Sequence, residues 1–204
     1  MPTTLQINNF IPITTVEGPG KRACIWVQGC KNTCPGCFSP NTWPIDGGKS
    51  IQINNLYDKI MELSPKIEGV TFSGGEPFLQ AEQLFALGKK IKENSNLSII
   101  TFTGYEYNQL INANNDNWNK LLSLTDILID GPYVKDLPSK ISLKGSENQK
   151  IHFLTSRYLE KKDEIQKESK KIEFHIRPDS TVIINGNVSD DVLKNLNGWI
   201  IKKN

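Results

Sequence analysis

Apolar residues along this chain fall into short continuous runs that alternate with amphipathic segments. Each run ends at turn-forming residues, which is typical of strands buried in a sheet, and such strands are expected at residues 22–29, 68–75, 97–104 and 125–131. The intervening segments space apolar residues at helical intervals and predict helices at residues 50–64, 80–94 and 105–113, with Ser50 as a plausible N-cap. This alternation predicts an α/β fold with a mostly parallel sheet.

The pattern weakens after the last of these strands. Residues 159–173 form a dense run of charges, for which a solvent-exposed helix or a mobile loop is the expected structure. Residues 173–178 and 180–186 predict a closing hairpin, and residues 189–200 have a helix-like pattern. No repeat or low-complexity tract interrupts the sequence.

Length and composition limit the class of protein. A chain of 204 residues with 37% hydrophobic content can bury one core, so we expect a single domain over residues 1–204, with a core at about 10–152 and an extension at 153–204 of unassigned role. Lys and Arg total 24 against 22 Asp and Glu, which argues against nucleic acid as a partner. No apolar run or N-terminal signal suggests a membrane, so a cytoplasmic protein is expected.

Three of the four cysteines are clustered in a segment that is expected to be a long loop. Cys30, Cys34 and Cys37 have the spacing C-x-x-x-C-x-x-C, which suits a loop around a compact soft-metal centre. In a reducing compartment such clusters bind metal more often than they form disulfides. Cys24 lies inside an expected strand and is interpreted as a small buried hydrophobe.

The number of thiolates distinguishes between possible metals. A structural zinc ion takes four protein ligands, and the two histidines, His152 and His175, have no ligand-like neighbourhood in the sequence. Three thiolates can hold three irons of a 4Fe-4S cluster and leave the fourth iron open to another ligand. The spacing therefore favours an iron-sulfur cluster, while a zinc module or an electron carrier stays open as a non-catalytic alternative.

A second group of residues follows the next expected strands. Gly74 and Gly75 allow a close approach of the backbone to a ligand, although paired glycines are also ordinary turn residues, and the Glu76 carboxylate suits an ammonium group. Thr103 ends the following strand. Ligand sites of parallel sheets lie at the carboxyl ends of the strands, so we expect these motifs and the cysteine loop to meet in space.

The cysteine triplet together with GGEP resembles the radical S-adenosylmethionine (SAM) enzymes, in which SAM occupies the open iron. The likeness covers roughly residues 10–152 and is most specific for the activating enzymes of glycyl radical enzymes. The segments that carry it are EGPGKR, VQGCKNTCPGCFSPNTW, TFSGGEPFLQ, TFTGYEY, LIDGPYV and LKGSENQK.

The resemblance implies an open, partial β/α barrel and an oxidoreductase activity. A flavodoxin- or ferredoxin-type reductant would deliver one electron to the cluster, and SAM would be cleaved to methionine and a 5'-deoxyadenosyl radical. That radical would take a hydrogen atom from a glycine of a partner enzyme, and the pattern is closest to activators whose partner is the large subunit of anaerobic ribonucleoside-triphosphate reductase. The extension beyond residue 152 leaves open an alternative, a radical SAM enzyme that modifies a peptide or a small molecule.

The resemblance also implies roles for individual residues. Cys30, Cys34 and Cys37 are the implied cluster ligands, and the implied SAM contacts are Gly36, Cys37, Phe38, Gly74, Gly75, Glu76, Thr103 and Asp130. Many relatives place an aromatic residue directly before the third cysteine, whereas this chain has Gly36 there, which makes Phe38 the candidate adenine contact. Trp43 is interpreted as a packing anchor, and residues 144–149 match a family motif without an assigned role.

Overall fold

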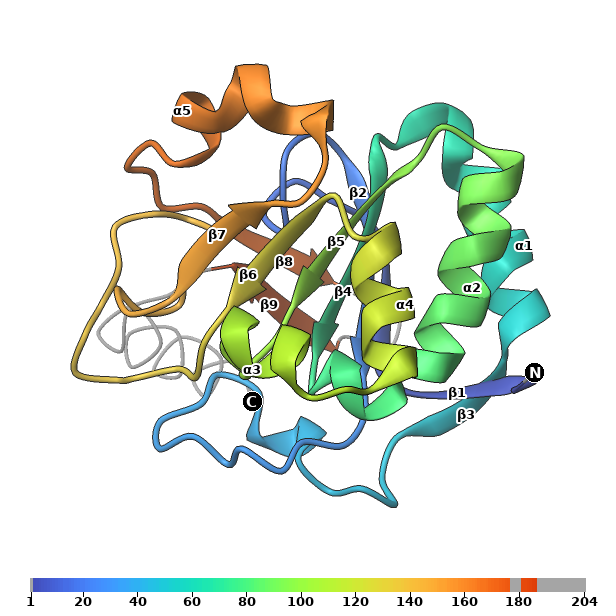
Figure 1. Cartoon of the computed structure of the whole chain (residues 1–204), viewed down its shortest axis with the longest axis horizontal. Coiled ribbons are helices and arrows are strands. Elements are labelled where there is room, and N and C mark those ends of the chain that lie inside the picture. Colours follow the sequence, from blue (N-terminus) through green and yellow to red (C-terminus); the bar gives the residue numbers. More distant parts are fainter. Residues whose placement is uncertain (1, 177–180, 187–204) are drawn as a thin grey trace.

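The computed structural model describes residues 2–176 and 181–186. A seven-stranded sheet with the order β3-β1-β2-β4-β5-β6-β7 runs through the centre of the molecule (Figure 1). Its four central strands are parallel, namely β2 (Arg22–Val27), β4 (Gly69–Gly74), β5 (Ser98–Phe102) and β6 (Ile127–Asp130). The α/β architecture with a mostly parallel sheet, predicted from the alternating pattern, is confirmed.

The outer strands of the sheet are antiparallel to their neighbours. β1 (Thr4–Thr14) lies between β2 and β3 (Lys49–Gln52), and β7 (Lys150–Phe153) pairs with β6. The prediction of Ser50 as a helix cap is wrong, because Ser50 lies in β3 opposite Gln6, and helix α1 (Ile53–Leu63) begins three residues later.

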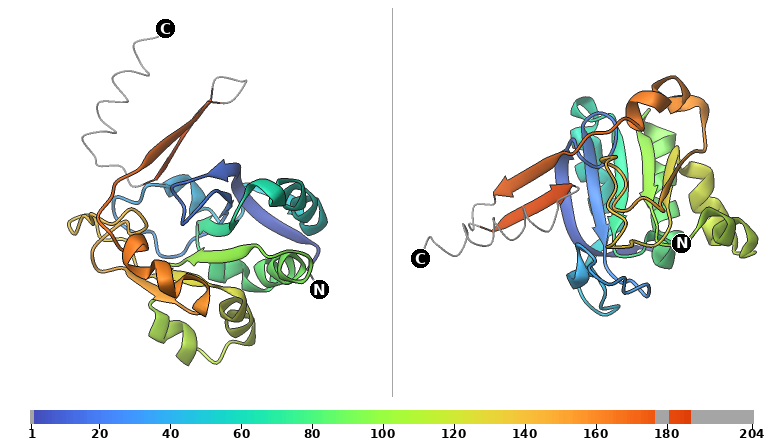
Figure 2. Two further views of the ribbon diagram at one scale, coloured as in Figure 1. Left: turned by 90° about the horizontal axis from the view of Figure 1, so that it is seen from above. Right: turned by 90° about the vertical axis from the view of Figure 1, so that its left-hand side faces the viewer.

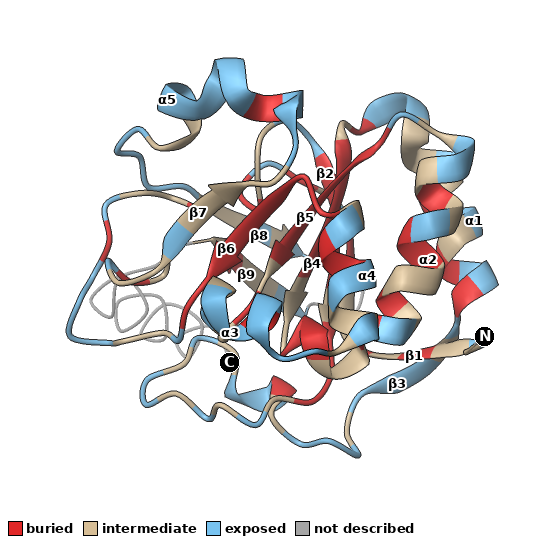
Figure 3. Ribbon diagram, viewed as in Figure 1, coloured by how far each residue is buried: buried red, intermediate tan, exposed pale blue. Residues whose placement is uncertain are grey.

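Helices cover one face of the sheet. Helices α1, α2 (Ala81–Asn94) and α4 (Asp116–Leu124) lie side by side there, and α3 (Tyr107–Asn112) precedes α4 (Figure 1). Short 3-10 segments connect these elements at η1 (Pro40–Thr42), η2 (Ser64–Lys66) and η3 (Pro77–Gln80). The central strands and the inner sides of the helices are buried (Figure 3).

Alternate residues of the central strands belong to two different cores. Ile99 of β5 and Leu128 of β6 pack with the helices, whereas the neighbouring Ile100 packs in a second cluster with Leu143 and Tyr158. Because successive side chains of a strand point to opposite faces, the second cluster covers the face away from the helices. Segments that follow β6 therefore close that face.

A buried arginine fastens one of these segments to the sheet. Arg22 is fully buried, and its guanidinium donates to Thr71 Oγ1 at 2.8 Å and to Ser98 Oγ at 2.9 Å. The Tyr158 hydroxyl lies 3.4 Å from Arg22 Nη1 and 2.8 Å from Ser98 Oγ, and it donates to Glu68 Oε1 at 2.7 Å. Burying a charge is costly unless its hydrogen-bonding groups find partners, and this network supplies them.

The region after β7 ends in a separate hairpin. The charged run forms η4 (Ser156–Lys161) and α5 (Lys162–Ile165), mostly exposed, and the predicted hairpin is confirmed as β8 (Ile172–Ile176) and β9 (Val182–Gly186). This hairpin lies on the side of the sheet opposite the helices (Figures 1 and 2). The helix-like pattern at residues 189–200 falls outside the described residues. None of the helices in the described part of the chain is both long and apolar enough to cross a membrane.

Candidate active site

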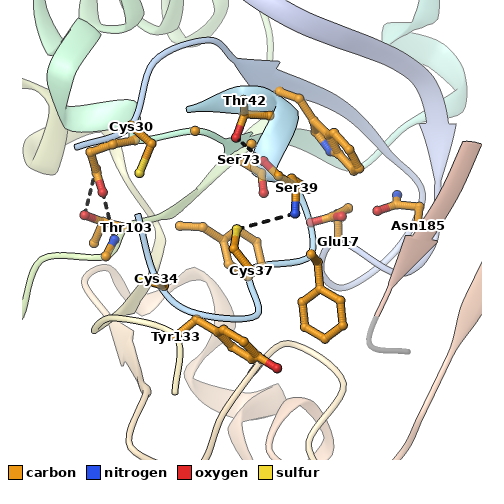
Figure 4. A pocket seen from close by; sticks show the side chains of 18 of the residues that line it. Glu17, Cys30, Cys34, Cys37, Ser39, Thr42, Ser73, Thr103, Tyr133 and Asn185 are labelled. Atoms are coloured by element: carbon orange, nitrogen blue, oxygen red, sulfur yellow. Dashed lines mark hydrogen bonds between the residues drawn. The ribbon is translucent and has the colours of Figure 1, made fainter. Parts of the chain in front are cut away.

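A cavity of about 480 Å³ opens at the carboxyl ends of the central strands (Figure 4). Its wall includes residues at or just beyond the ends of β2, β4, β5 and β6, namely Trp26, Ser73, Gly74, Phe102 and Gly131. The residues predicted from sequence that line it are Cys30, Cys34, Cys37, Phe38, Trp43, Gly74, Gly75, Glu76, Thr103, Gly145 and Gln149. The expectation that the cysteine loop and the strand-end motifs meet in space is thereby confirmed.

The cysteine loop is shaped by a tight turn between its second and third cysteines. Cys37 N donates to Cys34 O at 3.1 Å, Pro35 occupies the second turn position, and Gly36 has a φ of 76°. A turn with Pro second and a positive φ third requires glycine at that third position, which accounts for Gly36. Gly36 is not one of the residues that line the cavity, whereas Phe38 is.

The three thiols surround one space without converging on a point. Cys30, Cys34 and Cys37 are free and partly buried, and burial raises the pKa of the Cys30 thiol. In the described part of the chain, no three Cys, His, Asp or Glu side chains are close enough to hold one metal ion. A zinc ion would need thiolates at about 2.3 Å from one centre, whereas each cysteine of an iron-sulfur cluster binds its own iron. Three free thiols around one cavity are a donor set that fits a 4Fe-4S cluster.

The other candidate ligands lie elsewhere. Cys24 is fully buried in β2 and does not line the cavity, as predicted for a small hydrophobe. His152 Nε2 lies 3.0 Å from Asp130 Oδ2, and His175 Nε2 lies 3.2 Å from a carboxylate oxygen of Glu173. Neither histidine is among the residues that line the cavity.

Glu76 ties the loops of the site together. Its Oε1 accepts from Phe78 N at 3.0 Å and Thr103 Oγ1 at 2.8 Å, and its Oε2 accepts from Gly104 N at 2.8 Å and Asn32 Nδ2 at 3.4 Å. Burial raises the pKa of Glu76 to about 7, although these donors favour the ionised form. One carboxylate thus links the end of β4, the end of β5 and the cysteine loop.

The paired glycines allow two strand ends to touch. A Cβ at Gly75 would lie 2.4 Å from Gly29 O, and a Cβ at Gly74 would lie 2.6 Å from the Trp26 Cα. Gly75 N donates to Val27 O at 2.9 Å, and the next amide, that of Glu76, donates to Gly29 O at 2.8 Å. The close approach that glycine permits here is therefore to the backbone just before the first cysteine of the cluster loop.

Asp130, a predicted SAM contact, lies away from the cavity wall, whereas the 144–149 motif, which had no assigned role, borders the cavity. Asp130 is buried and its carboxylate accepts from Tyr107 N at 2.7 Å and Lys150 N at 3.1 Å, and it does not line the cavity. In the 144–149 motif, Gln149 Oε1 accepts from Gly145 N at 2.7 Å, which folds the loop along the cavity.

Sequence reasoning did not single out Glu17, which lies in the wall of the cavity. Glu17 is 8% exposed, and burial raises the pKa of its carboxyl to about 7, with a further upward effect from Glu173 that Asn185 and Arg22 oppose. It lies across the cavity from Cys30 and Thr103 (Figure 4). The sequence feature that could have identified Glu17 is its position in EGPGKR, one of the segments that carry the family resemblance.

The C-terminal hairpin also reaches the cavity. Val182, Ile184, Asn185 and Gly186 of β9 line it, together with Tyr133, whose ring centroid is 5.1 Å from that of Phe38. No local sequence pattern connects β9 with the cysteine loop, since the two segments lie about 150 positions apart in the chain.

Comparisons with known proteins give one consistent family. The model of the 4Fe-4S single cluster domain matches residues 16–152. The anaerobic ribonucleoside-triphosphate reductase-activating protein of Escherichia coli (strain K12) is 32% identical over 162 residues, covering 74% of this chain and 99% of that protein. The pyruvate formate-lyase-activating enzyme of Clostridium pasteurianum is 35% identical over 136 residues, covering 64% of this chain and 54% of that protein.

A solved structure shows weaker likeness. The crystal structure of QueE from Escherichia coli matches with a TM-score of 0.42 and 20% identity, covering 50% of this chain and 52% of that one.

Proposed function

This chain belongs to the radical SAM family of glycyl radical enzyme activating proteins, and from that premise we propose that it installs a glycyl radical on a partner enzyme. The proposed partner is the large subunit of an anaerobic ribonucleoside-triphosphate reductase, because the relatives matched over 99% of their own length carry that name. The chain is accordingly an enzyme, and its cosubstrate is proposed to be SAM.

The observation that carries this proposal is the arrangement of three free cysteines around a cavity at the strand ends. Cys30, Cys34 and Cys37 are proposed to hold the 4Fe-4S cluster, and their side chains face a space large enough for a nucleoside-sized ligand. When bound, the cluster and SAM supply the radical chemistry, in which one electron cleaves SAM to methionine and a 5'-deoxyadenosyl radical. The protein contributes binding, orientation and exclusion of water.

The strand-end loops are proposed to receive SAM. Gly74 and Gly75 bring the end of β4 against the cysteine loop, and the Glu76 carboxylate holds Thr103 and Gly104 at the same wall. Because Glu76 already accepts four hydrogen bonds, its first task is to fix these loops, and a contact with the ammonium group of SAM is a further proposal.

The remaining proposed SAM contacts come from the cysteine loop. Phe38 lines the cavity beside Tyr133 and offers a ring surface for adenine. Gly36 shapes the turn that presents Cys37, and Asp130 holds the backbone at the end of β6. A direct contact of either with SAM stays a prediction.

Apolar side chains line much of the rest of the cavity. Trp26, Phe102, Leu143 and Ile184 contribute to the wall, and such surfaces keep water away from reactive intermediates. We expect this to limit loss of the radical before it reaches the glycine.

Further features follow from the same proposal. The curved sheet is proposed to be the open, partial barrel of the radical SAM type, in one domain over residues 1–204. A flavodoxin- or ferredoxin-type protein is proposed as the reductant. Free clustered thiols favour a reducing compartment, so the cytoplasm is the proposed location.

The proposal is tested by anaerobic reconstitution of the protein with iron and sulfide. The reconstituted protein is then incubated with SAM, a low-potential reductant and the large reductase subunit of the same organism. We expect 5'-deoxyadenosine in the solution and a glycyl radical signal in the electron paramagnetic resonance spectrum of the reductase. Cys37→Ala is the matched control and is expected to give neither.

Two outcomes contradict the proposal in different ways. Formation of 5'-deoxyadenosine without any glycyl radical, together with a modified peptide or small molecule, would assign another substrate to the same chemistry. Bound zinc and no cleavage of SAM would exclude the enzymatic function altogether.

A further inference from the structure

We infer that the β8–β9 hairpin is a built wall of the active-site cavity and that Asn185 is a positioning residue that holds the Glu17 carboxyl at that wall. The inference rests on the proposed function. In this view the hairpin controls the fraction of SAM cleavage events that produce a glycyl radical in the partner.

The hairpin is fixed to the end of β1 by a single carboxylate. Glu173 Oε2 accepts from Thr14 Oγ1 at 2.6 Å, and Glu173 Oε1 accepts from Thr15 N at 2.7 Å and from Thr15 Oγ1 at 2.6 Å. Thr14 is 1% exposed. Glu173 therefore makes three hydrogen bonds to the end of β1, just before Glu17. These bonds fix the position of β8 relative to the sheet.

Asn185 stands opposite Glu173 in the hairpin and completes this attachment. The two residues are paired in the register of β8 and β9, so their side chains lie on the same face. Asn185 is 2% exposed, and its Nδ2 donates to Thr14 Oγ1 at 3.1 Å. Its Oδ1 accepts from Gly186 N at 3.0 Å, which fixes the orientation of the amide.

The same amide lies next to the Glu17 carboxyl. Figure 4 shows the two side chains pointing toward each other at the wall of the cavity, and the nearby amide opposes the upward shift that burial gives the pKa of the Glu17 carboxyl. Glu17 and Asn185 both line the cavity that contains the three cysteines. Burying a polar pair beside a ligand-sized cavity costs desolvation energy. Proteins keep such a pair where it orients a group for function.

The hairpin lies outside the part of the chain that defines the family. The family model ends at residue 152, before β8 begins at Ile172, and the reductase-activating relative is matched over 99% of its length by 74% of this chain. The cluster-binding segments lie within the matched part. The wall formed by β9 therefore lies outside the segment that the family model matches, and it borders the side of the cavity opposite Cys30 and Thr103 (Figure 4).

The consequence concerns the fate of the radical. Val182 and Ile184 of β9 add apolar surface to the cavity, and the anchored Glu17 fixes the facing wall. If this wall is loosened, water and small reductants reach the cavity, and more SAM is cleaved without hydrogen abstraction from the partner. The ratio of glycyl radical formed to 5'-deoxyadenosine released measures this directly.

The test compares Asn185→Ala with the wild type in the reconstituted system that contains the large reductase subunit. We expect the ratio to fall by about tenfold, because a loosened wall admits water and small reductants to the cavity. A residue that only stabilises the fold would lower both products together and leave the ratio unchanged. Phe174→Ala, a truncation in the same hairpin at a residue that does not line the cavity, is the matched control and is expected to keep the wild-type ratio.

A double-mutant cycle tests whether Asn185 acts through Glu17. In the Glu17→Gln background, Asn185→Ala is expected to change the ratio by less than twofold, because the carboxyl that it positions is gone. Equal effects of Asn185→Ala in both backgrounds would overturn the positioning role.

Iron content and the thermal midpoint are measured for each variant first. Should Asn185→Ala fail to retain the cluster, Asn185→Asp carries the test, since it keeps the volume and places a negative charge beside Glu17, and the same fall in the ratio is expected. A wild-type ratio in the folded variant overturns the inference. Failure of the wild-type protein to form any glycyl radical would instead overturn the proposed function.

Discussion

The contact between Gly75 and the cysteine loop offers a sharp test of the site geometry. Replacing Gly75 by Ala places a Cβ 2.4 Å from Gly29 O and 3.1 Å from Val27 O, and both neighbours are backbone atoms. Ordinary contact needs about 3.4 Å, so the two segments have to separate by roughly 1 Å. That separation weakens the hydrogen bonds from Gly75 N to Val27 O at 2.9 Å and from Glu76 N to Gly29 O at 2.8 Å.

The size of the effect follows from these contacts. Overpacking costs about 1 to 3 kcal/mol, and each weakened backbone hydrogen bond adds about 1 kcal/mol. We therefore expect the Gly75→Ala variant to lose about 3 to 5 kcal/mol of stability, a fall of roughly 10 °C in melting temperature for a chain of this size. Because Gly29 directly precedes Cys30, iron content after reconstitution is also expected to fall.

Gly88→Ala is the matched control. A Cβ at Gly88, inside α2, would lie 3.1 Å from Ile99 Cδ1 and 3.2 Å from Leu124 Cδ1, and the ends of these side chains can move. The gain of about 1 kcal/mol in helix propensity offsets the crowding, so little change is expected. The assay is thermal unfolding by circular dichroism under anaerobic conditions, with iron analysis. A Gly75→Ala protein that melts within 2 °C of the wild type and retains full iron would show that the two strand ends tolerate a Cβ at this position.

Three further outcomes are expected from single substitutions. Cys37→Ala should abolish iron binding, whereas Cys24→Ala should retain it, as measured by iron and sulfide analysis; loss of iron in both would contradict the assignment of the triplet. The pKa of Glu17 is about 7 in the folded protein, against an ordinary value of 4.5. As the pH rises from 4.5 to about 7, the carboxyl ionises in the unfolded chain but not yet in the folded protein, so the free energy of unfolding falls. Glu17→Gln should remove that fall and gain about 3 kcal/mol relative to the wild type between pH 4 and pH 8 in urea titrations, and equal pH profiles would disprove it. Tyr158→Phe removes the buried hydroxyl that donates to Glu68 Oε1 and bonds Ser98 Oγ, which should cost about 1 to 3 kcal/mol, or roughly 5 °C in melting temperature; an unchanged melting temperature would show that the hydroxyl is dispensable.

The central strands and the helices were predictable from the sequence because their patterns are local. Each parallel strand is buried on both faces and therefore appears as a continuous apolar run, and each covering helix carries a helical stripe. The outer strands were not predictable in this way. β3 has the sequence KSIQ and β7 has KIHF, in which polar residues interrupt the pattern, and only pairing with distant strands makes them extended. Ser50 shows the same effect, because its pairing with Gln6 overrides the local preference for a cap.

Local patterns in the sequence predict the chemistry of the site, whereas the surroundings of the site depend on how distant segments pack. Three clustered cysteines and GGEP predict an iron-sulfur cluster and SAM, because ligand type and spacing are local properties of the chain. Glu17 and Glu173 lie far apart in the chain, and the pKa of the Glu17 carboxyl rises to about 7 only because the fold buries it and brings Glu173 near. Burial and proximity between distant segments are products of chain folding, so no local pattern carries them.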